Sequence, residues 1–206
     1  MCVNTYRRLI HIPIIHTATD LGSLSESVQR LYVRQKGPQH WNHRTKTVNE
    51  LWGKISKQIE ALDLDYSKVW LYQDGLPHCG HEEKIVRDLA QAGSRNHQLL
   101  LELVQKGARI VGTESSELLL EEYALARQLL VSMNSGDTRA LKAQQRGGRD
   151  KRLLEERDGY IAKRINETLP KGEVGFVFLG LLHSLDGRLA SDIKISSLGR
   201  MATDKS

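Results

Sequence analysis

The clearest structural signal in the chain is residues 174–182, Val-Gly-Phe-Val-Phe-Leu-Gly-Leu-Leu, an almost uninterrupted apolar run that closes on His183. Such a run is typical of a strand that is buried on both faces in the middle of a parallel sheet. A histidine at the carboxyl end of that strand lies where open α/β sheets bind their ligands. We therefore expect the rest of the chain to bring further polar groups towards His183.

The remaining apolar and helical patterns predict an α/β fold, with a mostly parallel central sheet flanked by helices in a single domain over residues 1–206. Earlier strands are expected at 9–15, 68–72 and 108–112. Helices are expected near 24–36, 43–62, 82–91, 95–106, 116–131 and 149–169. The helices near 24–62 form an insertion, the weakly patterned segment 132–148 is predicted to be mobile, and the polar tail after Asp192 is predicted to fray.

The composition favours a soluble protein with an anionic ligand. Apolar residues make up 39% and charged residues 27% of the 206 residues, and the formal net charge is +5. With aromatic residues at 5%, base stacking has little support, so nucleic acid is not the expected partner. Cys2 and Cys79 cannot build a disulfide framework, and no apolar run reaches the roughly 18 residues of a membrane span. These features predict a cytoplasmic protein.

Each predicted strand is followed by ionisable side chains. His16 and Asp20 follow the first strand, Asp74 the second, Glu114 the third and His183 the last. The carboxyl ends of parallel strands share one edge, so these groups are expected to meet in a ligand site there. A single histidine after a strand is more often an ordinary hydrogen-bonded residue, but four strands that all end in this way favour a site. Histidines and carboxylates together could ligate a divalent metal or divide general acid and base work.

The positions of Arg157 and Asp158 allow two interpretations. They could belong to the solvated face of the helix near 149–169, or Arg157 could reach the sheet edge and hold a carboxylate or an anion. The residues alone favour the solvated face.

Residues 156–162, Glu-Arg-Asp-Gly-Tyr-Ile-Ala, and residues 178–183, Phe-Leu-Gly-Leu-Leu-His, resemble two motifs of the TraB/PrgY–TIKI–erythromycin esterase superfamily, which has ChaN-like haem-binding relatives. The motifs are an Arg-Asp-x-x-(Met/Ile)-Ala helix and a Gly-x-x-His strand end. Residues 13–16, Pro-Ile-Ile-His, are similar to a first Gly-x-x-His, although proline replaces the glycine. Asp74 stands where the family more often has glutamate, and Glu114 resembles its later glutamate.

The resemblance implies a hydrolase of ester or amide bonds, either metal-dependent or metal-free. Arg157 would stabilise the developing anion, and His16 or His183 would act on water as a base. A metal would be held by His16, Glu114 and His183, while Asp20, Asp74 and Asp158 would bind the ligand, a small-molecule or peptide substrate. The alternative is a non-catalytic sensor that binds a small anion or a metal at the same site.

Two further segments carry separate hypotheses. Residues 78–81, His-Cys-Gly-His, place soft metal ligands at close spacing, but no distant second pair completes a zinc site. The basic segment 139–152 lacks the interleaved aromatic residues of a nucleic-acid surface. A mobile lid or an arm that faces a phosphate is the other interpretation of this segment.

Overall fold

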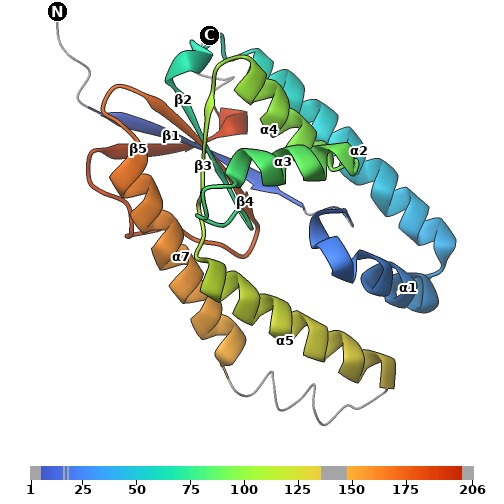
Figure 1. The fold of residues 1–206 in the computed structure, drawn as a ribbon. Coiled ribbons are helices and arrows are strands. Elements are labelled where there is room, and N and C mark those ends of the chain that lie inside the picture. Colours follow the sequence, from blue (N-terminus) through green and yellow to red (C-terminus); the bar gives the residue numbers. More distant parts are fainter. Residues whose placement is uncertain (1–5, 16, 18, 136–147, 201–206) are drawn as a thin grey trace, which may run out of the picture.

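Five parallel strands form one sheet in the computed structural model, which describes residues 6–15, 17, 19–135 and 148–200. The strand order is β3-β2-β4-β1-β5. The strands are β1 (Arg7–Ile14), β2 (Val69–Gln73), β3 (Arg109–Val111), β4 (Val174–Gly180) and β5 (Ile193–Ser197). This arrangement confirms the predicted α/β fold, and it places the predicted buried strand, β4, at the centre of the sheet (Figure 1).

Helices connect the strands and lie close to the predicted positions. They are α1 (Ser25–Lys36), α2 (Pro38–Glu60), α3 (Glu82–Gln91), α4 (Arg95–Gln105), α5 (Ser116–Ser135) and α7 (Arg149–Thr168). Short 3-10 turns cover Thr19–Leu24, Tyr66–Lys68 and Leu198–Arg200. Pro38 opens α2, where a missing backbone N–H costs nothing, and the Ser94 hydroxyl caps α4 by accepting a hydrogen bond from the His97 backbone N–H.

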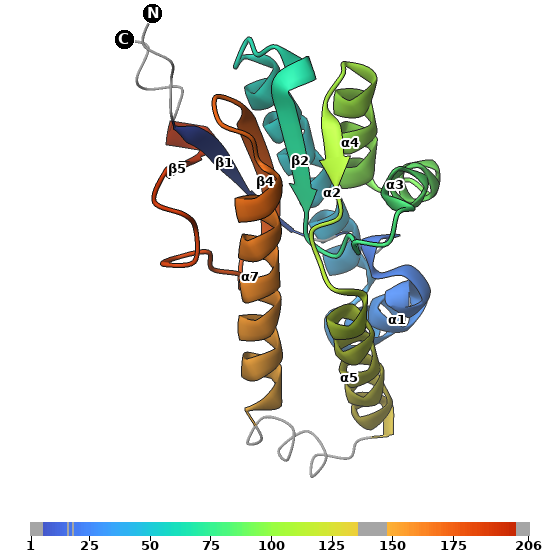
Figure 2. The same cartoon turned by 60° about the vertical axis from the view of Figure 1, so that its left-hand side comes forward.

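Alternation along the strands divides the core between the two faces of the sheet. Phe176 and Phe178 of β4 pack into a cluster with the buried residues of α2 and α4, whereas Val177 and Leu179 pack against α7. Figure 2 shows α7 along one side of the strands and α2 on the other. Because β4 is covered on both faces, its side chains from Gly175 to Leu179 are all buried, which explains the continuous apolar run in the sequence.

The prediction of a frayed tail after Asp192 is wrong for residues 193–197. These residues form β5, which pairs in parallel with β1 from Arg7↔Ile193 to His11↔Ser197. The guanidinium of Arg7 holds the start of the strand: its Nη2 and Nε donate to the two carboxylate oxygens of Asp192 at 2.7 and 3.0 Å. Two β-branched residues and this ion pair are enough to order a short edge strand.

Pro13 is tolerated in β1 because of where the neighbouring strand ends. The pairing of β1 with β5 stops at His11, whereas the pairing with β4 continues to Ile14. Pro13 therefore lies past the end of β5, where a missing ladder hydrogen bond is least costly.

Strand β4 is shorter than the apolar run predicts. It ends at Gly180, and the His183 backbone N–H donates to the Gly180 carbonyl oxygen at 3.1 Å, so the chain turns there. Leu181 and Leu182 are consequently 73% and 81% exposed. The last two leucines of the run are surface residues beside His183.

The predicted helical insertion is an integral part of one layer. α2 contributes Val48, Trp52, Ile55 and Ile59 to the core beneath the sheet.

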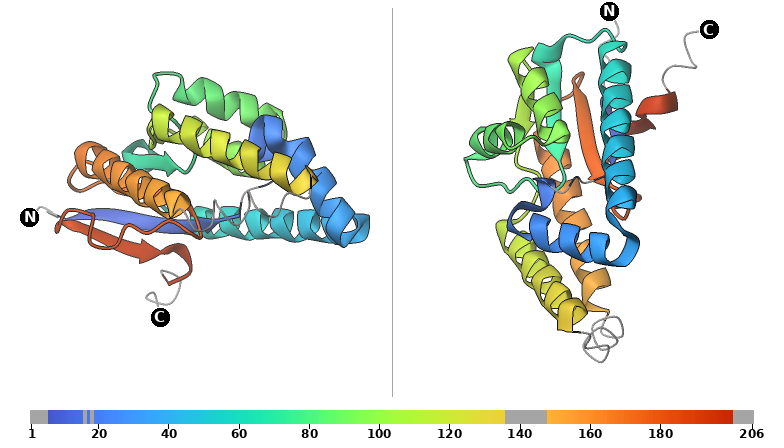
Figure 3. Two further views of the ribbon diagram at one scale, coloured as in Figure 1. Left: turned by 90° about the horizontal axis from the view of Figure 1, so that it is seen from below. Right: turned by 90° about the vertical axis from the view of Figure 1, so that its right-hand side faces the viewer.

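α5 and α7 lie beside each other (Figure 3), and Arg149 of α7 pairs with Glu121 of α5 at 3.0 Å. In the predicted mobile segment, residues 132–135 belong to α5, whereas 136–147 lie outside the described residues.

Candidate metal centre

Asp74 is fixed at the end of β2 by both of its neighbouring strands. Its backbone N–H donates to the Phe178 carbonyl oxygen at 2.9 Å, which extends the β2–β4 ladder by one residue. Its Oδ2 accepts a hydrogen bond from the Gly180 N–H at 3.0 Å. Gly75, with φ of 77°, then turns the chain away from the sheet. The carboxylate is thus held between the ends of β2 and β4.

Glu114 is the most deeply buried acid at this edge, with 0% of its surface exposed. Its backbone N–H donates to the Leu76 carbonyl oxygen at 3.0 Å, and its Oε1 accepts from the Gly75 N–H at 3.0 Å. Gly112 permits this approach, because a Cβ at that position would lie 2.4 Å from the His78 Cα. The chain after β3 therefore packs closely on the turn after β2 and delivers Glu114 beside Asp74.

Arg157 of α7 joins the carboxylates from the opposite side. Its Nη2 donates to Asp74 Oδ1 at 2.8 Å and to Glu114 Oε1 at 2.5 Å, and its Nε donates to Glu114 Oε2 at 2.8 Å. Nη1 donates to Glu122 of α5. These contacts use four of the five guanidinium N–H groups, and the side chain is 4% exposed. Of the two interpretations of Arg157, the contact with a carboxylate is therefore confirmed and the solvated face is wrong, whereas Glu155 on the same helix is exposed.

Asp158 and His183 form the third part of the site. His183 Nδ1 lies 2.6 Å from Asp158 Oδ1, and the Ser184 N–H donates to Asp158 Oδ2 at 3.1 Å. His183 Nε2 faces Asp74 Oδ2 at 3.4 Å. The imidazole is therefore clamped between two aspartates, with Nδ1 towards α7 and Nε2 towards the other carboxylates.

We call Asp74, Glu114, Glu122, Arg157, Asp158 and His183 the Arg157 cluster. Burial is the largest influence on the pKa of His183 and lowers it, but the hydrogen bond and charge of Asp74, with the hydrogen bond to Asp158, outweigh burial and raise the pKa to about 9. Burial raises the pKa of Glu114, against the effect of Arg157. The buried part of the cluster sets three carboxylates, those of Asp74, Glu114 and Asp158, beside one guanidinium and one imidazole, whereas the side chain of Glu122 is 49% exposed.

Three predicted residues from three different strand ends meet within this cluster. One ligand atom each from Asp74, Glu114 and His183 lies within 4.8 Å of the others. The ligands of a single ion, each about 2.0–2.4 Å from it, have separations of about 3–4.8 Å. Two carboxylates and one imidazole form a donor set that suits zinc, manganese or cobalt. The residues present therefore fit a divalent cation.

Two predicted residues do not take part in the described cluster. His16 lies outside the described residues, so its role stays a prediction. Asp20 is bound elsewhere: its Oδ1 accepts from the Ser94 hydroxyl and lies 3.4 Å from His97 Nδ1, and its Oδ2 accepts from the Thr17 N–H at 2.6 Å. Ser94 caps α4 and His97 lies in its first turn, so Asp20 ties the chain after β1 to that helix.

Sequence reasoning missed Glu122 and Gly180. Glu122 lies in α5, where Glu121 and Glu122 have the appearance of ordinary surface acids, and only the packing of α5 beside α7 brings one of them to Arg157. Gly180 acts through its backbone N–H, which donates to Asp74. Its position in the Gly-x-x-His pattern was the available signal.

Among the described residues, the group of metal-ligand side chains that gathers closely enough for one ion is Asp74, Glu114 and His183. His78, Cys79 and His81 do not form such a group, and Cys79 is an exposed free cysteine. A metal site in the turn before α3 therefore has no support from the geometry.

No family model, curated protein or solved structure matches the chain. The resemblance to the erythromycin esterase superfamily thus stays a prediction. Across the described parts of the chain, no helix is long and apolar enough to cross a membrane.

Proposed function

We propose that the Arg157 cluster is the centre of a divalent-metal-dependent hydrolase that cleaves an ester or amide bond. The observation that carries the proposal is the convergence of Asp74, Glu114 and His183 from three strand ends, with the buried carboxylate of Asp158 beside them. Buried charges that a chain does not neutralise itself are costly, and a bound cation offsets that cost.

The surroundings of His183 support its assignment as a metal ligand. The Asp158 carboxylate accepts a hydrogen bond from the Nδ1–H of His183, which leaves Nε2 to face Asp74 and Glu114. Metal-bound histidines usually donate their second N–H to a carboxylate in this way, which fixes the ring and increases its basicity. A pKa of about 9 also means that free His183 is protonated at neutral pH, so it is not suited to the role of base that the sequence suggested for it.

The other residues take distinct roles. A divalent cation supplies Lewis-acid polarisation and lowers the pKa of bound water. Arg157 holds the carboxylates of Asp74 and Glu114 in place, and its contacts leave little of the guanidinium to bind an oxyanion. Glu122 is 49% exposed at its side chain, so we assign it the exchange of protons with solvent. Leu181 and Leu182 offer an exposed apolar surface beside His183 for the substrate.

The test begins with elemental analysis of untagged protein purified without chelators, followed by calorimetric titration with Mn²⁺ and Zn²⁺. We expect one ion per chain. His183→Gln should weaken metal binding at least about tenfold, because it removes the imidazole that we assign as a metal ligand. His97→Gln is the matched control, since it changes another buried histidine beside an aspartate and should leave metal affinity unchanged.

A panel of esters, lactones and peptides then tests turnover with and without added metal. Cleavage that requires metal and is lost in His183→Gln supports the hydrolase. Metal binding without cleavage of any panel member would favour the non-catalytic sensor. Equal metal affinity in the wild type and in His183→Gln would reject this site altogether.

A further inference from the structure

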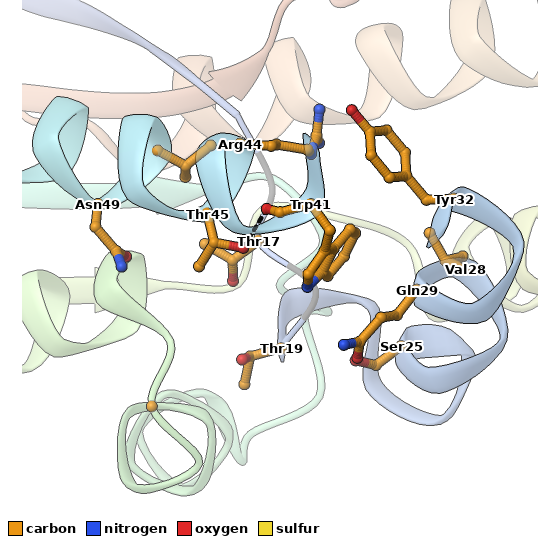
Figure 4. A pocket seen from close by; sticks show the side chains of 12 residues that line it. Thr17, Thr19, Ser25, Val28, Gln29, Tyr32, Trp41, Arg44, Thr45 and Asn49 are labelled. Atoms are coloured by element: carbon orange, nitrogen blue, oxygen red, sulfur yellow. Dashed lines mark hydrogen bonds between the residues drawn. The ribbon is translucent and has the colours of Figure 1, made fainter. Parts of the chain in front are cut away.

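A second cavity lies apart from the Arg157 cluster, between α1, α2 and the chain that follows β1. Its volume is about 510 Å³, within the range of small-molecule sites. Figure 4 shows Tyr32 and Gln29 of α1 facing Trp41 and Arg44 of α2 across this cavity, with Thr17 beside α2. We call it the Trp41 pocket. It shares no lining residue with the Arg157 cluster.

The wall of the Trp41 pocket combines an aromatic corner with one positive charge. The rings of Tyr32 and Trp41 are 5.5 Å apart between centroids in an edge-to-face arrangement, and the Arg44 guanidinium carbon lies 6.0 Å from the centre of the Tyr32 ring. Arg44 is the charged residue among the described residues that line the pocket, and no aspartate or glutamate is found among them. An anion that enters the pocket therefore meets no repelling carboxylate in its wall.

Several donors in the wall have no hydrogen-bond partner among the described residues. No hydrogen bond between described residues engages the indole N–H of Trp41, the side-chain amide of Asn49 or the guanidinium of Arg44. Guanidinium groups match carboxylate and phosphate oxygens in a planar arrangement, and aromatic faces accept flat apolar groups. The two halves of the wall thus suit the two halves of one amphiphilic ligand.

The pocket is also held in shape before any ligand arrives. Thr17, in its wall, donates from its N–H and hydroxyl to Asp20 Oδ2 at 2.6 and 2.9 Å. Asp20 is tied in turn to Ser94, which directly follows the lining residue Gly93. Ser94 has 0% of its surface exposed. These buried hydrogen bonds fix two parts of the wall relative to each other, which reduces the ordering cost of binding.

We propose that the Trp41 pocket binds a small organic anion in which a carboxylate or phosphate is attached to a planar aromatic group. The anionic end contacts Arg44, and the ring lies against Trp41 and Tyr32. This assignment does not depend on the hydrolytic function proposed above, because the two sites have separate residues.

Phenyl phosphate is the probe, and its two separate parts, inorganic phosphate and phenol, are the controls. Titration calorimetry and tryptophan fluorescence should show phenyl phosphate binding at least about fivefold more tightly than either part. Arg44→Gln should weaken phenyl phosphate binding about tenfold through loss of a charge-assisted hydrogen bond. Trp41→Leu should weaken it and remove the fluorescence change.

Arg34→Gln is the matched control for charge, because Arg34 is an exposed arginine of α1 outside the pocket wall. It should leave affinity unchanged, and so should His183→Gln, which alters only the Arg157 cluster. Circular dichroism confirms that each variant is folded. The proposal is overturned if phenyl phosphate binds no better than its parts, or if Arg34→Gln weakens binding as much as Arg44→Gln.

Discussion

Two buried clusters in this molecule each bring an aspartate to a histidine, and they differ in how completely their charges are satisfied. In the Ser94 cluster, formed by Asp20, Ser94 and His97, hydroxyl and backbone donors surround one carboxylate. In the Arg157 cluster, four carboxylates share one guanidinium and one imidazole. In the first cluster, the hydrogen-bond donors around Asp20 belong to the cluster and to the neighbouring Thr17. In the second cluster, the carboxylates outnumber the basic side chains that contact them.

The pKa values follow the same division. Burial acts most strongly on Asp20 and raises its pKa, but hydrogen bonds from His97, Ser94 and Thr17 outweigh it and leave the pKa lowered. In the Arg157 cluster, the pKa of Glu114 is raised by burial in spite of Arg157. A contact between aspartate and histidine therefore does not by itself indicate a ligand site. The gathering of several potential ligand side chains from different strand ends is the better indication.

The largest expected effect on stability comes from replacing the arginine side chain of the Arg157 cluster. Arg157→Leu leaves Asp74 and Glu114 buried side by side without their shared partner, and we expect a loss of about 3–5 kcal/mol in the free energy of unfolding. Urea denaturation measures it. Arg152→Leu, on an exposed part of the same helix, should cost no more than about 1 kcal/mol. Similar losses in both variants would mean that the cluster is not held together by Arg157.

The pH dependence of stability provides the next test. His183 has a folded pKa raised to about 9 from 6.5, so its stabilising contribution is complete below about pH 6.5 and disappears as pH rises through 9. This difference corresponds to about 3 kcal/mol. Denaturation in the presence of EDTA should show that loss in the wild type and in His97→Gln, but not in His183→Gln. A flat profile in the wild type would contradict the clamp between the two aspartates.

A smaller loss is expected in the Ser94 cluster. Ser94→Ala removes the cap of α4 and the hydroxyl that binds Asp20, at a cost of about 1–2 kcal/mol in the free energy of unfolding. Ser67→Ala, which changes an exposed serine bonded to nearby Asp65, is the comparison and should cost less. Metal affinity should stay the same in Ser94→Ala. A change in that affinity would show that the two clusters are coupled.

The smallest expected effect on stability belongs to Glu122. Its side chain is 49% exposed, and Arg157 keeps its other two carboxylates, so Glu122→Gln should cost less than about 1 kcal/mol. If Glu122 exchanges protons with solvent, turnover of any cleaved substrate should nevertheless fall. Stability and turnover that change together would remove this assignment.

Much of the sheet and part of the site could be predicted from the sequence, because both depend on local patterns. The apolar run around Phe176 indicates a central strand. Because parallel strands end at the same edge of the sheet, the residues that follow them, Asp74, Glu114 and His183, must lie at that edge. β5 was missed because Ile193 and Ile195 are its only apolar residues and give too short a pattern. In addition, the strand is held in place by contacts with β1 and Arg7, which are far away in the chain.

The contacts that could not be predicted are those set by packing between distant elements. Glu122 reaches Arg157 because α5 and α7 lie side by side. Asp20 reaches Ser94 across 74 positions of the chain, through a turn that no local pattern connects to β1. Asp20 was predicted to lie in the site because it follows a strand. Its hydrogen bonds with Thr17 and Ser94 instead hold it at the start of α4.

The strand order has a consequence for how the chain folds. β1 precedes the other four strands of the sheet in the chain, yet its neighbours are β4 and β5, which come last among these strands. Until residues 174–197 have been made, β1 has no strand to pair with, whereas β2 and β3 can already pair with each other. Contacts between such distant segments are slow to form. The apolar Leu9, Ile10 and Ile12 must therefore stay protected from aggregation until β4 has been made and joins β1 to β2.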